Sequence, residues 1–537
     1  MTTREEALAR LTAPGAPFEV RVEDVLGEPM EVFAHRQRSL GEILRASLRF
    51  GSREYLVTGE SRLTFAGHHE AVCALAAALR DEYGVRKGDR VAVCAANRPE
   101  WIVTFWAAVS LGAVAVGMNS MWAAPEIAHG LGLTEPAVLV ADAPRRALAG
   151  EPGIPVLSIE DDLPVLVERH RGAARPVEAV DEDDPAVILF TSGTTGRPKG
   201  ATHSHRNVIA AVWFHLLNDA VAAEMGRPQA GRRFLLATPL FHIAALHNLA
   251  VVRLAVGDTA VLHLGRFDIV RVLRLIEKER VTNWGAVPTM LSRLVEHDLS
   301  PYDLTSLRTV SVNSAPSSPA LKQRLREVLP RAGAALGTTY GLTESCTAAT
   351  LASPAELLAD PGTAGGPVPT MRVEIRGPGG ERVPDGVEGE ICLRGAQMML
   401  GYWRDPEATR AASAPGGWFR TGDLGRIVDG RLHVSSRRSD LILRGGENVY
   451  PAEVEDRIGA HPAVRECVVL GVPHHDLGQE VAAVVVVKPD AEVTERELRE
   501  HTAAGIARYK VPSRWTIRTE PLPRNATGKV NRTQVSI

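Results

Sequence analysis

The chain has 537 residues, of which 45% are hydrophobic, and at ~100–200 residues per domain this length predicts two to four folded units rather than one simple core. Charged residues make up 23% of the chain, which excludes a disordered or fibrous protein. The 61 basic and 64 acidic side chains leave a net charge of -3, so no global attraction to nucleic acid or to anionic lipid is expected.

The basic residues are 54 arginines and only 7 lysines. A GC-rich genome accounts for most of this bias, but each remaining lysine is a candidate for a task that arginine cannot perform. Four of them are expected on helix surfaces or in turns: Lys87, Lys278, Lys322 and Lys488.

The N-terminal sequence MTTREEALARL alternates acids and bases and lacks the apolar core of a secretory signal. The 5 cysteines form no C-x-x-C pair, which argues against a disulfide framework or a zinc knuckle. The uncharged stretch Trp101–Pro125 is interrupted by Gly112 and Gly117, so it predicts a buried helix at about 101–111 and a buried strand at about 113–117 rather than a membrane span. We therefore expect a cytoplasmic protein.

Short β-rich runs alternate with helical patterns over most of the chain, which predicts layered α/β subdomains with parallel sheets. The helices are expected at 267–281 and 318–329, and the buried strands at 90–97, 186–190, 234–238, 259–264 and 308–313. From about Met371 shorter strands and glycine turns indicate a small β-rich subdomain. The last hundred residues read as a compact α+β unit, with Ala482–Val487 as its clearest strand.

The strongest local motif is LFTSGTTGRPKGA, from Leu189 to Ala201. Its glycines let backbone N–H groups surround phosphate oxygens, its hydroxyls add donors, and its lysine supplies a compact positive charge. It is not a Walker loop, because the lysine is followed by glycine instead of Ser or Thr. The predicted phosphate-binding residues are Thr191, Ser192, Gly193, Thr194, Thr195, Gly196 and Lys199.

The string TSGTTGRPKG resembles the signature loop of the adenylate-forming superfamily, which includes acyl-CoA synthetases, peptide-synthetase adenylation domains and firefly luciferase. The resemblance runs from Leu63–Leu79 to Leu522–Arg532, and its pattern is most similar to fatty-acid or related acyl-CoA ligases. It implies a large α/β N-terminal domain at 1–438, with its β-rich subdomain at about 371–438, and a small mobile α+β domain at 439–537.

A carboxylate is a poor electrophile, and adenylation activates it by attaching AMP and expelling pyrophosphate. That reaction requires charge neutralisation and positioning more than covalent catalysis. The segment TTYGLTE resembles the adenine motif of the family, which implies that Thr339 and Tyr340 bind the nucleotide, with Tyr340 against adenine. It also places Thr343 on the α-phosphate and Glu344 on Mg²⁺, for which one carboxylate plus phosphate oxygens is sufficient.

The resemblance assigns further nucleotide contacts nearer the C-terminus. Asp423 in WFRTGDLG would hold the ribose hydroxyls, and Arg437 would contact ribose and phosphate. Lys529 in LPRNATGK matches the lysine that reaches the α-phosphate and the carboxylate during adenylation.

The hinge of the family falls on Ser439, with Asp440 beside it, where Asp or Lys is usual. Gly445 and Gly446 lie where the resemblance implies a loop lining the tunnel for the pantetheine arm of coenzyme A. From residue 508 onward the chain has seven basic residues and one acid, which fits either a face that meets nucleotide and CoA phosphates or a merely solvated basic face.

The resemblance places His242 of PLFH beside the reacting carboxylate, in an acyl pocket that also contains Asn313, Ser314, Ala315 and Gly341. Several of these positions depart from the common family pattern, as does Ser436 before the arginine, so the acid cannot be copied from one subfamily. The pairs His203/His205 and His474/His475 lack partners for a metal site and are expected on the surface.

The first hypothesis is an ATP-dependent, AMP-forming acyl-CoA ligase for a hydrophobic acid, with ATP, Mg²⁺ and coenzyme A as cofactors or co-substrates. The second is an enzyme that makes only the acyl-adenylate and delivers it to a carrier protein or a separate thiolating partner. A non-catalytic binder is disfavoured because Lys199, Glu344, Asp423 and Lys529 are all present. An amino-acid-loading domain is disfavoured by the missing acid after His242, and a luciferase-type oxygenase stays open. No nucleic-acid partner and no membrane span are expected, and the sequence does not determine the oligomeric state.

Overall fold

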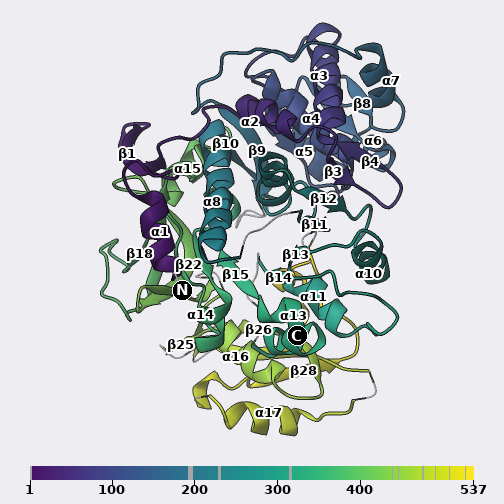
Figure 1. The fold of residues 1–537 in the computed structure, drawn as a ribbon. Helices are drawn as coiled ribbons and strands as arrows, with labels where there is room; N and C mark the ends of the chain where they lie inside the picture. Colours follow the sequence, from purple (N-terminus) through teal and green to yellow (C-terminus); the bar gives the residue numbers. More distant parts are fainter. Residues whose placement is uncertain are drawn as a thin grey trace.

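The computed structural model describes most of the chain. The described residues are 3–191, 198–227, 231–313, 317, 319–437, 440–444, 447–474, 477–489, 491–506, 508–525 and 528–537, without the side chains of 437, 447 and 448. Two large sheets, one antiparallel sheet and one C-terminal sheet carry the architecture (Figure 1).

The first large sheet has seven strands, and its central strands are parallel and buried. Continuous apolar runs such as VAVG form these strands because helices cover both faces of a parallel sheet. In spatial order the strands are β20 (Gly401–Tyr402), β10 (Lys199–Ser204), β9 (Pro185–Thr191), β6 (Val114–Gly117), β5 (Arg90–Cys94), β7 (Val138–Ala141) and β8 (Val156–Ser158).

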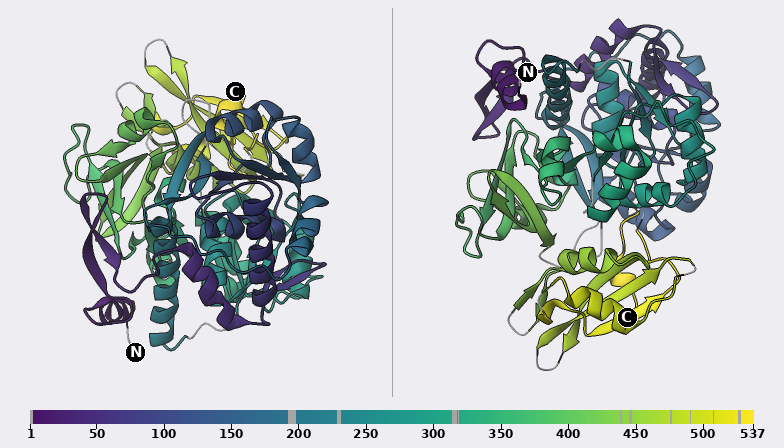
Figure 2. Two further views of the ribbon diagram at one scale, coloured as in Figure 1. Left: turned by 90° about the horizontal axis from the view of Figure 1, so that it is seen from above. Right: turned by 60° about the horizontal axis from the view of Figure 1, so that its bottom comes forward.

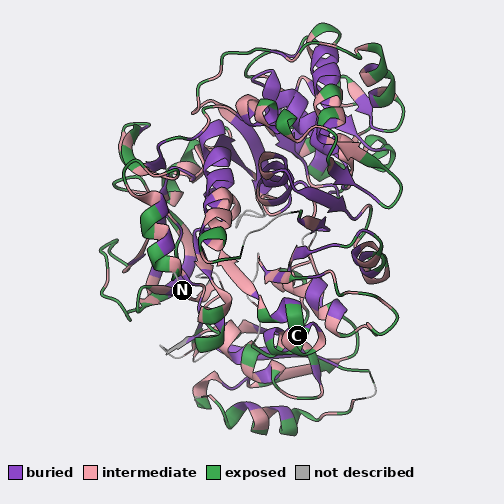
Figure 3. Cartoon of the chain, in the orientation of Figure 1, coloured by how far each residue is buried: buried purple, intermediate pink, exposed green. Residues whose placement is uncertain are grey.

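The second large sheet has nine strands and is parallel at its centre, from β15 to β3. In spatial order they are β17 (Gly366–Pro367), β16 (Thr350–Ala352), β15 (Gly337–Tyr340), β14 (Thr309–Val312), β13 (Asn283–Ala286), β11 (Arg233–Leu236), β12 (Thr259–Leu262), β3 (Glu54–Val57) and β4 (Arg62–Thr64). Figure 3 shows the sheets and the helices between them as the most continuously buried part of the molecule.

Helices cover the two large sheets. Some begin directly from a strand: Ser204, the last residue of β10, accepts a hydrogen bond from the Asn207 backbone N–H and caps α8. The helices are α2 (Leu40–Ser47), α3 (Phe65–Asp81), α4 (Pro99–Ser110), α5 (Ala124–Thr134), α6 (Ala143–Ala149), α7 (Asp162–Arg169), α8 (His205–Glu224), α9 (Val252–Val256), α10 (Ile269–Lys278), α11 (Pro288–Val295), α12 (Pro319–Val328), α13 (Pro330–Ala334) and α14 (Pro354–Ala359).

A smaller antiparallel sheet follows the second large sheet in the chain. Its strands are β18 (Met371–Arg376), β19 (Gly389–Gly395), β22 (Trp418–Val428), β21 (Ser413–Ala414) and β23 (Arg431–Arg437), with α15 (Pro406–Ala412) between them. The N-terminal helix α1 (Arg4–Thr12) packs on α8, and the hairpin of β1 (Val20–Val25) and β2 (Glu28–Phe33) follows it.

The C-terminal part forms its own sheet and its own apolar core, and it lies below the rest of the chain in the right view of Figure 2. The strands are β24 (Ile442–Arg444), β25 (Glu447–Val449), β26 (Val464–His474), β27 (Gly478–Val487) and β28 (Arg514–Arg518), covered by α16 (Pro451–Gly459) and α17 (Glu495–Ala503). The domain boundary at 438/439 stays a prediction, because both residues lie outside the described part of the chain.

The mixed α/β fold class with a large N-terminal and a small C-terminal domain is confirmed. The uncharged stretch forms α4 and β6, both buried, and in the described residues no helix is long and apolar enough to cross a membrane.

Two smaller expectations about surface residues are wrong. His203 is fully buried on β10, which lies between β9 and β20, and His205 is fully buried at the start of α8, where its Nδ1 accepts from the Leu40 backbone N–H. Lys322 is buried with its Nζ donating to the Pro361 carbonyl at 2.6 Å.

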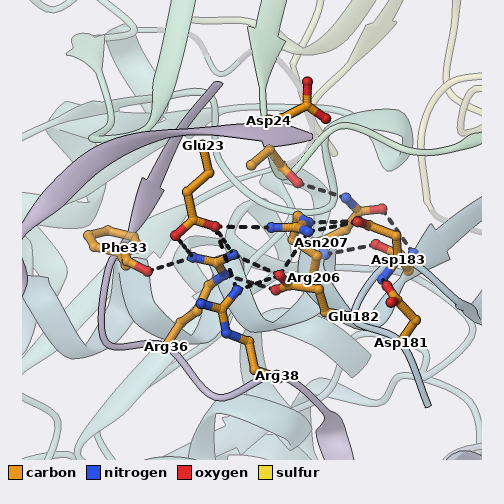
Figure 4. Close-up of polar contacts among 12 residues, drawn as sticks. Glu23, Asp24, Phe33, Arg36, Arg38, Asp181, Glu182, Asp183, Arg206 and Asn207 are labelled. Carbon is orange, nitrogen blue, oxygen red and sulfur yellow. Dashed lines mark hydrogen bonds and ion pairs between the residues drawn. The ribbon is translucent and has the colours of Figure 1, made fainter. Parts of the chain in front are cut away.

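An ion-pair network connects the hairpin to the segments before β9 and after β10 (Figure 4). Arg36, whose side chain is 2% exposed, donates to Glu182 at 2.8 Å and to Glu23 at 2.7 Å. Arg206 pairs with the same Glu182 at 2.8 Å and with Asp183 at 2.6 Å. Each buried guanidinium thus has carboxylate partners, which offsets the cost of removing its charge from water.

We predict that Glu23→Gln lowers the free energy of unfolding at pH 7 by about 2 kcal/mol, the value typical of a hydrogen bond to a charged group. Hydrogen bonding from Arg36 lowers the pKa of Glu23 from 4.5 to about 2. Because the folded-state pKa is depressed, this stabilisation is complete above pH 4.5 and is lost as the pH falls toward 2.

The measurement is thermal unfolding of the wild type and of Glu23→Gln from pH 7 to pH 3. The difference in Tm between them should shrink on acidification. Glu327→Gln is the matched control, since Glu327 is half exposed and pairs with the exposed Arg324. A Tm difference that does not change with pH would contradict the assignment.

Candidate active site

The antiparallel strands β9 and β10 place Thr191 directly opposite Lys199, at the two ends of the predicted phosphate loop. The residues between them that were predicted to bind phosphate, Ser192–Gly196, lie outside the described residues. Behind the loop Gly200 lies against Ile188, where an added Cβ would come within 2.8 Å of the isoleucine side chain. A side chain at position 200 would therefore disturb the packing of β9 against β10, the two strands that the loop connects.

Lys199 and Glu344 lie on either side of one tyrosine. The Lys199 ammonium is 5.2 Å from the ring centroid of Tyr402, and the Tyr402 hydroxyl donates to Glu344 Oε1 at 2.8 Å. Burial and the neighbouring Glu344 charge raise the pKa of Tyr402, so the hydroxyl stays protonated and remains a donor. The tyrosine thus orients the predicted metal carboxylate relative to the predicted phosphate lysine.

The predicted adenine and ribose residues also meet. The Tyr340 hydroxyl donates to Asp423 Oδ2 at 2.7 Å, although the two residues are 83 positions apart. Strand pairing of β22 with β23 places Asp423 opposite Arg437. The backbone of Arg437 therefore lies beside Asp423, while the side chain of Arg437 lies outside the described part.

Two threonines at the end of β15 connect this strand to β14. Thr338 donates to the Val312 carbonyl at 2.8 Å, and Thr339 donates to Asn313 Oδ1 at 3.1 Å. Gly341 follows, and a Cβ there would approach the Thr347 carbonyl to 2.6 Å, so only glycine fits without a shift. Thr343 and Glu344 form the first turn of a short 3₁₀ helix (Thr343–Ser345). Ser314 and Ala315 lie outside the described residues.

His242 faces the C-terminal domain. Burial and the positive charge of Lys529 lower its pKa to about 3, so the imidazole is neutral at pH 7. Its Nε2 atom is buried and has no hydrogen-bond partner in the described part of the chain. Lys529 belongs to a tip that enters the large domain, where Gly528 has φ +81° and a Cβ would lie 2.8 Å from Thr289 Oγ1.

Two further contacts join the domains in this arrangement. Arg465 of β26 pairs with Glu296 at 2.8 Å, and Tyr450 bonds to Glu388. Most of the basic residues predicted as a C-terminal face are paired within their own domain: Lys510 with Glu453, Arg514 with Glu480, Arg524 with Glu466, and Arg532 with Glu455 and with Asp440 of the predicted hinge. Ser439, Gly445 and Gly446 lie outside the described residues.

The oxygen ligand that Glu344 offers suits a cation that also binds phosphate. Glu344 is 9% exposed, lies near Lys199 and is oriented by Tyr402, and Mg²⁺ needs only one or two carboxylates when phosphates supply the other oxygens. Within the described residues no cluster of three or more His, Cys, Asp or Glu forms a dedicated metal site. The geometry therefore favours a metal that arrives with a nucleotide.

Tyr402 is the site residue that sequence reasoning missed. It lies in a two-residue strand, β20, whose pairing with β10 brings it to Lys199 and Glu344. The dipeptide Gly-Tyr carries no sequence signal of such a role. Only the long-range strand pairing provides it.

Comparisons with known proteins show the family to which the chain belongs. The model of the family "AMP-binding enzyme" matches residues 44–403, and that of "AMP-binding enzyme C-terminal domain" matches residues 453–529. The chain is 36% identical over 485 residues to the long-chain-fatty-acid–CoA ligase FadD13 of Mycobacterium tuberculosis, covering 88% of this chain and 92% of the relative. It is equally 36% identical over 492 residues to feruloyl-CoA synthase of an Amycolatopsis species, covering 89% and 94%.

Solved structures are similar over nearly the whole chain. The o-succinylbenzoate CoA synthetase of Bacillus subtilis, in complex with the acyl-adenylate intermediate OSB-AMP, matches with a TM-score of 0.81 and 31% identity, covering 93% of this chain and 98% of that one. The anthranilate CoA ligase AuaEII, in complex with anthranoyl-AMP, matches with a TM-score of 0.85 and 27% identity, covering 92% and 96%.

The chain belongs to the AMP-binding enzyme family, the adenylate-forming superfamily that its motifs resemble. Within that class it is an AMP-forming acid–thiol ligase, whose substrates are ATP, a carboxylic acid and coenzyme A.

We predict that Tyr402→Phe lowers kcat/KM for adenylation about tenfold, because the loss of one hydrogen bond to a buried carboxylate costs about 1.5 kcal/mol. The Mg²⁺ concentration needed for half-maximal rate should rise in the same variant. Pyrophosphate release measured over a Mg²⁺ titration tests both the lower kcat/KM and the higher Mg²⁺ requirement. Tyr83→Phe, just beyond α3, is the control, and an unchanged Mg²⁺ dependence in Tyr402→Phe would contradict the role.

Proposed function

We propose that the protein activates a carboxylic acid with a largely hydrophobic body and transfers it to coenzyme A in two half-reactions at one site. In the first, a carboxylate oxygen attacks the α-phosphorus of ATP, and the bond to the pyrophosphate oxygen breaks. In the second, the CoA thiol attacks the acyl carbonyl, loses its proton, and AMP leaves. Lys199, Glu344, Asp423 and Lys529 carry the contacts, with Glu344 as the residue that would hold Mg²⁺.

The observation that supports this most strongly is the approach of Lys529 to His242. The two residues lie in different domains, and an ammonium beside a neutral imidazole at the predicted acyl site suits an incoming carboxylate and α-phosphate. The Lys529 charge would stabilise the negative charge that accumulates as the carboxylate approaches the phosphate. The neutral His242 can contact the acid without adding a competing charge.

The rest of the site supports separate parts of the same reaction. The bond from Tyr340 to Asp423 arranges an aromatic ring and a carboxylate for adenine and ribose, and the carboxylate can accept from a vicinal diol. We further propose that 1–438 and 439–537 move relative to each other about Ser439 and Asp440, and that Gly445 and Gly446 admit the pantetheine arm. A cytoplasmic location fits these soluble substrates.

We predict that Lys529→Ala lowers the adenylation rate by at least 100-fold while still converting a supplied acyl-adenylate and CoA to the thioester. The reason is that Lys529 stabilises charge only in the first half-reaction. Pyrophosphate release measures the first step, and thioester formation measures the second. Lys488→Ala, an exposed lysine of the same domain, is the matched control. Normal pyrophosphate release by Lys529→Ala would overturn the assigned role.

The function itself is tested by screening pyrophosphate release over fatty, aryl, cyclic and terpenoid acids, with and without coenzyme A. We expect release with at least one hydrophobic acid, and consumption of CoA with formation of a thioester. Acyl-adenylate that accumulates in the presence of CoA would instead favour delivery to a carrier protein or a separate thiolating partner. The same preparations, analysed by light scattering, would give the oligomeric state.

A further inference from the structure

Beyond His242 the chain forms a wider turn, a π-helix at Leu246–Val251. The backbone N–H of Asn248 donates to the Ile243 carbonyl at 3.0 Å, and the Asn248 side-chain Nδ2 donates to the same carbonyl at 3.1 Å. Asn248 lies six residues after His242 in the chain, with the backbone turn at Ile243–Asn248 between them. π-turns of this kind are frequent at functional sites because they displace one side chain from the regular helical face.

The Asn248 side chain forms a small polar cluster with two residues from other elements. His215 Nε2 on α8 is 3.2 Å from Asn248 Oδ1, and the Thr347 hydroxyl donates to the same oxygen. Thr347 follows the predicted α-phosphate and metal residues, and its carbonyl touches Gly341 of the predicted acyl pocket. The cluster therefore lies between the segment of His242 and the segment of Thr343 and Glu344.

Partly accessible side chains run from the reacting centre to this cluster. His242, Ile243, Ala244, Asn248 and His215 all retain accessible surface, whereas their neighbours Ala245, Leu246 and His247 are buried. Burial nevertheless lowers the pKa of His242 to about 3 and that of His215 to about 4. This strip of partly accessible side chains continues from His242, at the predicted acyl site, to the cluster.

The hydrogen bonds determine what the cluster still offers. Because Nδ2 of Asn248 donates to a carbonyl, its other atom must be Oδ1, and His215 must then carry its proton on Nε2. His215 Nδ1 is thus an acceptor, and it has no hydrogen bond from the described residues. The second N–H of Asn248 is a donor that is likewise not used within the described part of the chain. One acceptor and one donor side by side match a hydroxyl group, which both donates and accepts.

The charges around the cluster argue for a neutral ligand group. The charged residues near His215 pair among themselves: Arg232 with Asp219 and Asp258, and Arg253 with Asp258 at 2.7 Å. Two positive and two negative charges leave no net charge to attract a second carboxylate or an amine. A hydroxyl, by contrast, needs no counter-charge.

We propose that His215 and Asn248 recognise a hydroxyl group of the acid substrate, on the end of the molecule opposite the carboxylate held near His242. The acid is therefore a hydroxy acid with a hydrophobic middle, aryl or alkyl. This inference rests on the proposed function, because it assigns the far end of the same acyl site. A site that must pair its buried polar groups discriminates strongly against an analogue that lacks the hydroxyl.

The test compares matched acids in the pyrophosphate-release assay. The probes are 3-(4-hydroxyphenyl)propanoate, its 4-methoxy ether and 3-phenylpropanoate, with 6-hydroxyhexanoate and hexanoate as the alkyl pair. We expect kcat/KM on the order of 100-fold higher for each hydroxy acid than for its unsubstituted partner. The methoxy ether, which accepts but cannot donate, should resemble the unsubstituted acid.

Variants then assign the preference to the cluster. Asn248→Leu should bring the hydroxy-to-unsubstituted ratio close to one while activity with 3-phenylpropanoate persists. Asn218→Leu is the matched control on α8, since its side chain accepts from Arg4 and makes no hydrogen bond to the cluster within the described residues, and it should keep the wild-type ratio. His215→Phe provides a second variant if Asn248→Leu fails to fold, which circular dichroism and Tm would reveal.

The outcomes separate this inference from the proposed function. A wild type that activates acids with a hydroxy-to-unsubstituted ratio near one, or a preference that both variants retain, overturns the hydroxyl site and leaves the ligase function intact. A wild type that releases pyrophosphate with no acid in the probe set or in the wider screen overturns the proposed function as well.

Discussion

The active site depends on how the strand pair β9–β10 is held, because the predicted phosphate loop connects these two strands. Glu182 and Asp183 precede β9, Arg206 follows β10, and the three are joined by ion pairs at 2.6–2.8 Å. Arg36 attaches the N-terminal hairpin to the same cluster. The ends of this strand pair that lie away from the loop are therefore tied to each other by charges that burial makes costly to separate.

The same strand pair organises the chemistry further along the chain. β10 pairs with β20, which brings Tyr402 to Lys199 and to Glu344. The second large sheet contributes Tyr340, and the antiparallel sheet contributes Asp423. The predicted site is thus assembled where the sheets converge, and the small domain adds Lys529. In the proposed function the sheets hold the nucleotide contacts, whereas the lysine, whose charge is needed in only one half-reaction, lies on a separate domain.

The acyl end of the site follows a different physical rule. In the proposed function phosphate and ribose are recognised by charges and carboxylates, whereas the acid would lie in an interior where every polar group needs a partner. Asn248 is held by a π-turn and by its bond to the Ile243 carbonyl, and this fixes the tautomer of His215. These hydrogen bonds leave one N–H of Asn248 as a donor and Nδ1 of His215 as an acceptor, side by side.

Much of this protein was determined by its sequence alone. Apolar strands alternating with helices gave the layered α/β fold, and the motifs around Lys199, Tyr340, Asp423 and Lys529 gave the family, because both depend on local patterns. The tertiary structure alone decided which residues meet. Tyr402 had no sequence signal, His203 and Lys322 were expected on the surface but are buried, and the pairing of His215 with Asn248 joins α8 to a distant turn. Contacts between segments far apart in the chain arise from strand register and packing, which a local pattern does not specify.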